Sequence, residues 1–176
     1  MVRALRAALT RASQDDAVTA VIVLGTGDAF SAGADLKTFL AGEPPLAQAL
    51  ARRQLGALFL LIEAYHKPLV AAVNGDALGA GFGLVAACHL AVAAGSARFG
   101  LPGVRLGIMP MTIMPVVFRS LPRKLGLDLM LTGRLMDAPE ALASGFINAV
   151  LPADQLPEAA ARLALEASNR PLTIGV

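Results

Sequence analysis

Two short segments of the sequence suit the binding of one oxygen atom through backbone N–H groups. In each, an apolar run is followed by a turn of small residues and a predicted helix start: residues 21–24 lead to 31–35, and residues 70–73 lead to 77–81. Small residues let a ligand approach the backbone, and the first turn of a helix leaves N–H groups without intrahelical partners. Two such donors on one oxygen would form an oxyanion hole, where each can contribute roughly 3–4 kcal/mol in a transition state.

The residues alone also allow a simpler interpretation, in which both turns only pack strands against helices. Other chemistries have fewer candidates. One cysteine, Cys88, excludes an internal disulfide and a thiolate cluster, and two histidines, His66 and His89, are too few for a histidine-based metal site. We therefore expect no metal. No serine, histidine and acid stand in a recognisable catalytic arrangement either, which argues against a serine peptidase.

The elements that must position these turns follow a regular alternation. Apolar, β-branched runs predict strands, and residues 17–24 and 68–73 are continuous enough to predict strands buried on both faces. Residues 96–110, rich in glycine and proline, are predicted to be irregular. Helical spacing or helix-start signals predict helices between the strands, so the expected class is α/β with parallel strands. The expected strands are residues 17–24, 68–73, 90–94 and 146–151; the expected helices are residues 1–13, 46–65, 78–87, 112–120, 123–131, 138–144 and 153–168.

Composition limits the partners of the chain. Its 176 residues suit one domain, and 56% hydrophobic residues with a mean hydropathy of +0.63 predict a large core and a subunit interface. The net charge is only +2 and the basic residues are scattered, so no nucleic-acid partner is expected. Residues 77–95 are apolar but rich in alanine and glycine, which favours a buried helix and strand over a membrane span. Residues 1–13 have the composition of a transit peptide, but their spacing favours an amphipathic helix.

Two longer motifs carry a resemblance to a known family. Residues 30–36 read Phe-Ser-Ala-Gly-Ala-Asp-Leu, and residues 67–81 read Lys-Pro-Leu-Val-Ala-Ala-Val-Asn-Gly-Asp-Ala-Leu-Gly-Ala-Gly. Together with later matches at residues 131–134, 138–145 and 150–152, they resemble the enoyl-CoA hydratase/isomerase (crotonase) family over essentially the whole chain. The resemblance implies one crotonase-like core domain over residues 1–176, a spiral of strand–strand–helix repeats. It also implies a cytoplasmic homotrimer or dimer of trimers, here short of the family's flanks at both ends.

The same resemblance implies a site. By matching position, the backbone N–H groups of Ala34 and Ala80 form the oxyanion hole for an acyl-CoA thioester. The coenzyme A thioester is then the substrate, and no separate cofactor is expected. The residues that would contact it are Ala32, Asp35, Leu36, Lys37, Gly79 and Gly81.

Two positions depart from the family pattern. Hydratases of this family hold water with two glutamates, and Gly83 and Gly103 stand at those positions here. Losing a positioned acid–base group typically costs about 10²–10⁴-fold in rate. Two functions therefore remain open: an acyl-CoA-binding enzyme that stabilises a thioester enolate, and a non-catalytic pseudoenzyme or structural subunit of a crotonase-type oligomer.

Other candidates for proton transfer have simpler interpretations. Asp76 is expected to form a turn, His89 to be structural, and Cys88 to be a small buried residue. Asp128 is expected on the surface, and Asp137 as a helix N-cap. Three methionines could line an acyl pocket but are predicted to belong to the core: Met109, Met111 and Met114.

Overall fold

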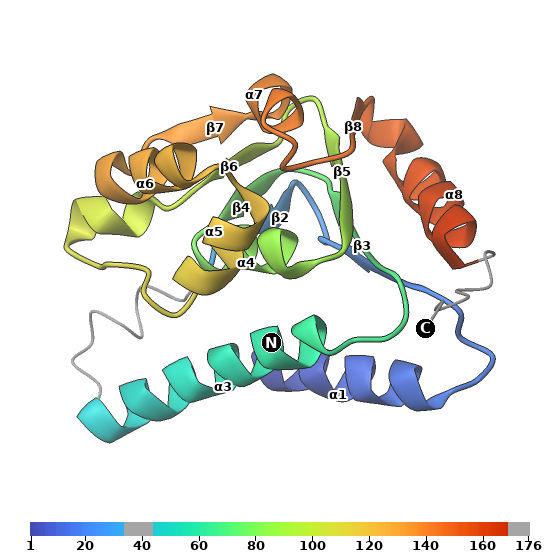
Figure 1. Cartoon of the computed structure of the whole chain (residues 1–176), viewed down its shortest axis with the longest axis horizontal. Helices are drawn as coiled ribbons and strands as arrows, with labels where there is room; N and C mark the ends of the chain where they lie inside the picture. Colours follow the sequence, from blue (N-terminus) through green and yellow to red (C-terminus); the bar gives the residue numbers. More distant parts are fainter. Residues whose placement is uncertain (34–43, 169–176) are drawn as a thin grey trace, which may run out of the picture.

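The computed structural model describes residues 1–33 and 44–168, and within them the strands form two four-stranded sheets (Figure 1). In the first sheet all neighbouring strands are parallel. In the second sheet the last pair, β6 and β7, is antiparallel, which departs from the all-parallel expectation. The first sheet has the order β1 (Val21–Leu24), β3 (Leu69–Val73), β5 (Leu90–Ala94) and β8 (Ala149–Leu151); the second has β2 (Ala29–Ser31), β4 (Asp76–Leu78), β6 (Arg98–Gly100) and β7 (Leu135–Asp137).

Three strands of the first sheet each lead into a strand of the second and then toward a helix, whereas β8 leads directly toward α8. The pairs β1–β2, β3–β4 and β5–β6 repeat this step, which is the strand–strand–helix spiral expected from the sequence. None of the helices in the described ranges combines the length and apolar character needed to cross a membrane. The α-helices are α1 (Val2–Gln14), α3 (Pro45–Glu63), α4 (Ala80–Ala87), α5 (Met114–Ser120), α6 (Arg123–Thr132), α7 (Ala138–Ala143) and α8 (Leu156–Ser168), with short 3-10 helices at Pro102–Leu106 and Ala153–Gln155.

Strand β3 lies at the centre of the packing because both of its faces are covered. All five of its residues are buried. Leu69, Ala71 and Val73 belong to the main core, whereas Val70 and Ala72 point to a smaller core beneath α8. Figure 1 shows α8 beside the first sheet, and α1 and α3 side by side along another edge of the molecule. The prediction of a strand buried on both faces is therefore confirmed for this segment.

The same prediction is wrong for the first strand. β1 covers only Val21–Leu24, at the edge of the first sheet, and its burial alternates. Ile22 and Leu24 remain 39% and 48% exposed. An apolar run therefore identified the strand correctly but not its position in the sheet, because edge and central strands here have the same composition.

Residues 96–110 also differ from the expected irregular segment. They contain β6 and the 3-10 helix Pro102–Leu106. Strands of three residues, such as β2, β4 and β7, are too short to show an alternating pattern in the sequence. They form nevertheless because each pairs with a neighbour in the second sheet.

The first helix is held by polar contacts as well as by its apolar face. The Tyr65 hydroxyl donates to the Leu9 carbonyl at 2.9 Å. Lys67 Nζ donates to the carbonyls of Ala12 and Asp15, near the end of the helix. Leu9 is buried in the main core. The preference for an amphipathic helix over residues 1–13 thus agrees with α1.

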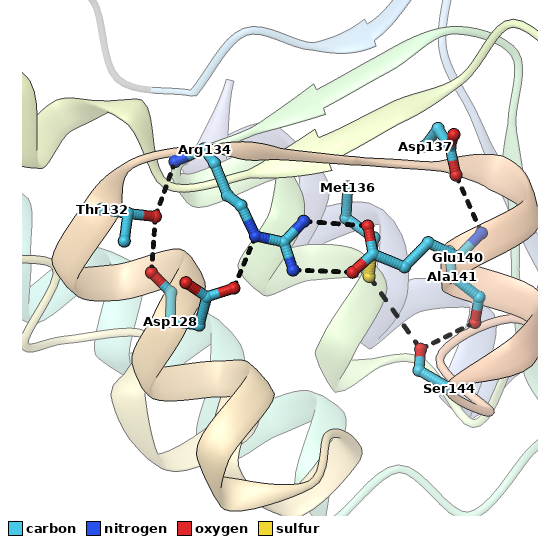
Figure 2. A network of polar contacts seen from close by, with 8 residues as sticks. All are labelled: Asp128, Thr132, Arg134, Met136, Asp137, Glu140, Ala141 and Ser144. Atoms are coloured by element: carbon cyan, nitrogen blue, oxygen red, sulfur yellow. Dashed lines mark hydrogen bonds and ion pairs between the residues drawn. The ribbon is translucent and has the colours of Figure 1, made fainter.

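A charged network ties α6 to α7 across β7 (Figure 2). Arg134 donates to Asp128 from Nε and to both carboxylate oxygens of Glu140 from its two terminal nitrogens. Hydrogen bonds to these two carboxylates raise the pKa of Arg134. Asp137 accepts a hydrogen bond from the Glu140 N–H at 2.8 Å, as expected of an N-cap. Asp128 and Asp137 therefore have structural partners.

Candidate active site

The two glycine turns identified in the sequence touch one another in the structure. Gly33 has a φ of +96° and Gly79 a φ of +54°, conformations that favour glycine. A Cβ on Gly33 would lie 2.8 Å from the Leu78 carbonyl oxygen and 3.2 Å from the Ala80 nitrogen. The turns meet because they follow β2 and β4, which are parallel neighbours. Any side chain at Gly33 would therefore separate them.

Helix α4 presents an unused donor at this contact. Gly79 is its N-cap, and the Gly79 carbonyl accepts from the Gly83 N–H at 3.1 Å. Gly79 N–H donates to the Gly100 carbonyl at 2.9 Å. Ala80, the first helical residue, has no intrahelical acceptor for its N–H, and no acceptor for it is found in the described part of the chain. This N–H is therefore able to bind a ligand oxygen.

A cavity of about 310 Å³ opens beside this donor. Its volume lies at the lower end of the range typical of small-molecule sites. One wall comes from the glycine turns, a second from α3, and a third from the segment that follows β6. The lining residues are Ala32, Arg52, Leu55, Gly79, Ala80, Leu101, Pro102, Gly103, Leu106, Ile108, Met109, Pro110, Met111, Thr112 and Ile113.

The cavity brings together part of the expected site. Ala32, Gly79, Ala80 and Gly103 all line it. Gly81 does not line it; this glycine is buried against β2, where an added Cβ would lie 2.5 Å from the Ser31 carbonyl oxygen. The remaining expected site residues lie outside the described residues: Ala34, Asp35, Leu36 and Lys37.

Two of the three methionines also belong to the cavity. Met109 and Met111 are 43% and 61% exposed and line it, so their assignment to the core was wrong. Met114, at the start of α5, does pack against the main core. The difference follows from position, because residues 109 and 111 precede α5 in a segment without regular structure, whereas residue 114 lies in the helix.

Gly83 and Gly103, where the sequence analysis expects the family's glutamates to be missing, have different surroundings. Gly83 is buried inside α4, and a Cβ there would lie 2.8 Å from Ile113 Cγ2 and 3.1 Å from Phe59 Cζ. Gly103 lines the cavity, and its nearest neighbours would all belong to Ile108, at 3.6 Å or more. Apolar side chains thus fill the space next to position 83, whereas position 103 is open. No carboxylate is among the described lining residues.

The other candidates for proton transfer are bound elsewhere. Asp76 is the first residue of β4, not a turn residue as expected, and forms a two-point ion pair with Arg98 at 2.8 and 2.6 Å. His89 Nδ1 accepts a hydrogen bond from the Leu69 N–H at 3.0 Å, and partial burial lowers the pKa of His89. Burial raises the pKa of the Cys88 thiol to about 12. Cys88 and His89 follow the last turn of α4, at the end of the helix opposite Ala80.

Comparison with known proteins identifies the family of the chain. The family profile described as enoyl-CoA hydratase/isomerase matches residues 1–174.

The chain belongs to the enoyl-CoA hydratase/isomerase family.

Solved structures of the family superpose closely on the chain. A Silicibacter pomeroyi enoyl-CoA hydratase/isomerase family protein is 39% identical with a TM-score of 0.90, covering 97% of this chain and 72% of its own. An enoyl-CoA hydratase from Mycobacterium smegmatis is 30% identical with a TM-score of 0.91, covering 97% and 66%. The rat enoyl-CoA hydratase domain-containing protein 3, mitochondrial, is 34% identical over 93% of this chain, which spans 55% of that protein.

Three residues at or beside the candidate cavity were not predicted from the sequence: Arg52, Ile113 and Phe59. Arg52 is exposed on α3 and also lines the cavity. Ile113 and Phe59 fill the space beside Gly83. The spacing of Arg52 and Leu55, three positions apart on one helix, could have indicated a shared face. Nothing in the sequence indicates that Ile113 and Phe59 approach Gly83.

Proposed function

We propose that this member of the family binds an acyl-CoA thioester, with the thioester oxygen between the backbone N–H groups of Ala80 and Ala34, and stabilises the enolate that forms from it. The main support for this proposal is the cavity beside Ala80, whose N–H has no acceptor among the described residues. Gly33, which directly precedes Ala34 in the sequence, lies against the same helix start. Negative charge is favoured at a helix N-terminus, so an oxyanion fits this position.

The lining residues support some family reactions better than others. Water addition in this family uses two glutamates, and both positions are glycine, at residues 83 and 103. Each missing acid–base group typically costs about 10²–10⁴-fold. We therefore expect reactions that need a stabilised thioester enolate but not both glutamates, such as an isomerisation or a decarboxylation, and only slow hydration.

The decisive experiment removes the Ala80 donor without removing the helix. Proline is tolerated in the first turn of a helix, so Ala80→Pro deletes the N–H, while Ala80→Gly keeps it and serves as the matched control. The probe is a conjugated 3-arylacryloyl-CoA thioester, whose absorption shifts to longer wavelength when its carbonyl is polarised. We expect a red shift with the unchanged protein and with Ala80→Gly, and its loss in Ala80→Pro. The same shift and affinity in all three proteins would refute the proposal.

A second function is favoured by one observation. Because Ile113 and Phe59 occupy the space next to Gly83, the chain could serve as a non-catalytic subunit of a crotonase-type oligomer. Turnover of a short 2-enoyl-CoA, or of a branched β-carboxyacyl-CoA, by a homogeneous sample would exclude this function if the turnover disappears in Ala80→Pro. Absence of turnover with retained probe binding would favour it.

We also propose that the chain assembles as a homotrimer or dimer of trimers and that it is located in the cytoplasm. Several large apolar side chains on the surface fit a subunit interface: Ile22, Leu24, Leu60 and Leu131. Sedimentation equilibrium of the purified chain tests the assembly, and a monomer at micromolar concentration would contradict it.

A further inference from the structure

One charged side chain lines the candidate cavity within the described part of the chain. It is Arg52, on the wall formed by α3. Leu55, three positions later on the same helix, lines the cavity beside it. The wall that follows β6 is apolar near Leu106, Ile108 and Met111. Among the described lining residues, Arg52 therefore provides the one charge beside a largely apolar cavity.

Arg52 has no anionic partner among the described residues. The ion pairs found there involve Arg98, Arg119 and Arg134. Arginine carries a planar set of five N–H donors that matches the two oxygens of a carboxylate. Such charge-assisted, two-point pairs are among the strongest hydrogen bonds in proteins. The guanidinium is thus available to an anion that enters the cavity.

The position of Arg52 relative to the helix start suggests which anion. Ala80 and Arg52 lie on different walls of one cavity of about 310 Å³, so one ligand in the cavity can contact both. We propose that Arg52 binds a carboxylate at the far end of the acyl chain, and that the preferred ligands are short dicarboxylic mono-CoA thioesters. This inference rests on the proposed function, because it assumes that the thioester oxygen binds at Ala80.

A fully apolar acyl chain fits these walls less well. It would fill the apolar part of the cavity but would leave the exposed guanidinium bound only to water. A terminal carboxylate adds charge-assisted hydrogen bonds to the guanidinium. The phosphates of coenzyme A share the same anionic chemistry, so the experiment must separate a carboxylate on the acyl chain from a phosphate on the carrier.

The test uses matched thioesters that differ only at the end of the chain. Butanoyl-CoA is compared with succinyl-CoA, pentanoyl-CoA with glutaryl-CoA, and hexanoyl-CoA with adipoyl-CoA, by titration calorimetry on the whole chain. In at least one pair we expect the dicarboxylic thioester to bind about tenfold more tightly, as for a charge-assisted hydrogen bond. Arg52→Gln should remove that preference and leave the affinity for the monocarboxylic partner nearly unchanged.

Arg53→Gln is the matched control, because Arg53 neighbours Arg52 but does not line the cavity. It should keep the full preference. Equal affinity within every pair would overturn the inference. A different result for Arg52→Gln would also overturn it: equal weakening of both CoA thioesters in each pair, with normal binding of the corresponding pantetheine thioesters. This result would mean that Arg52 binds a phosphate of coenzyme A. If no thioester binds the unchanged protein, the proposed function itself fails; binding that is lost in Ala80→Pro supports it independently of Arg52.

Discussion

Gly83 and Gly103, the two glycines that the sequence analysis places at the positions of the hydratase glutamates, have different surroundings in the structure. Gly83 is enclosed, and an added Cβ would lie 2.8 Å from Ile113. Gly103 faces the cavity, and the nearest atom to an added Cβ would be 3.6 Å away. Both glycines remove a carboxylate, yet only at position 83 has the neighbouring core closed over the space.

The two positions therefore differ in whether the present structure has space for a carboxylate. At position 83 a carboxylate would need new space and would be buried among apolar side chains, which is costly without a partner. At position 103 a carboxylate would enter the existing cavity that Ala80 also lines. One substitution could therefore restore an acid–base group at position 103, but not at position 83.

The largest expected effect is that of Gly83→Glu on stability. The added side chain must displace Ile113 or Phe59, and overpacking together with burial of a polar group should cost about 3 kcal/mol or more. Urea denaturation followed by circular dichroism measures the change. Gly103→Glu is the control and should stay within about 0.5 kcal/mol of the unchanged protein, as is usual for substitutions without steric conflict. Equal midpoints for the two variants would remove the distinction between the positions.

A double-mutant cycle tests whether Ile113 is the residue in steric conflict with a side chain at position 83. Ile113→Ala alone creates a cavity and should cost about 2–5 kcal/mol. In the Gly83→Glu background it also makes room for the new side chain, so the two costs should not add. We expect the double variant to be about 0.5–3 kcal/mol more stable than the sum predicts. Additive costs would mean that the conflict at residue 83 does not involve Ile113.

The next effect concerns chemistry at position 103. Under the proposed function, the new carboxylate of Gly103→Glu would accept the α-proton of butanoyl-CoA while the Ala80 N–H binds the resulting enolate oxygen. A positioned base contributes about 10²–10⁴-fold, and we expect exchange of the α-hydrogens for deuterium in D₂O to accelerate toward the lower end of this range. Mass spectrometry of the recovered thioester measures the exchange. Gly103→Gln has the same shape without the base, and equal rates in the two variants would contradict the prediction.

The strands and turns that position this site were predicted from the sequence better than the residues that surround its cavity. β3 and β5 were predicted because continuous apolar runs indicate strands of a parallel sheet, although the similar run in β1 belongs to an edge strand. The contact between Gly33 and Gly79 followed from two glycine turns after neighbouring strands. These features depend on local residue types, which the sequence displays directly.

The walls depend on contacts between distant residues, and these could not be predicted. Gly83 meets Phe59, from α3, and Ile113, which precedes α5, so its enclosure is decided by elements 24 and 30 positions away in the chain. The segment with Met109 and Met111 has no helical or strand periodicity from which burial could be deduced. The sequence therefore indicated that the glutamates were missing, but not that only one of the two spaces had closed.

The smallest expected effect is on the pH dependence of stability, for which the two histidines are compared. His89, although largely exposed, accepts the Leu69 N–H on Nδ1, and that bond requires an unprotonated Nδ1. His66 is exposed and stacks beside Tyr65. Partial burial lowers the pKa of His89 below its ordinary value of 6.5, so the unfolded chain binds this proton more readily than the folded chain. Stability linked to His89 is therefore complete above pH 6.5 and decreases as the pH falls below it.

We expect thermal unfolding between pH 5 and 8 to show a small loss of stability on the acid side of this range. His89→Asn keeps an acceptor near the Leu69 N–H but cannot gain the proton, so it should flatten the slope. His66→Gln removes the other imidazole and should leave the slope unchanged. If the flattening occurred instead in His66→Gln, the hydrogen bond at Leu69 would not be the source of the acid sensitivity.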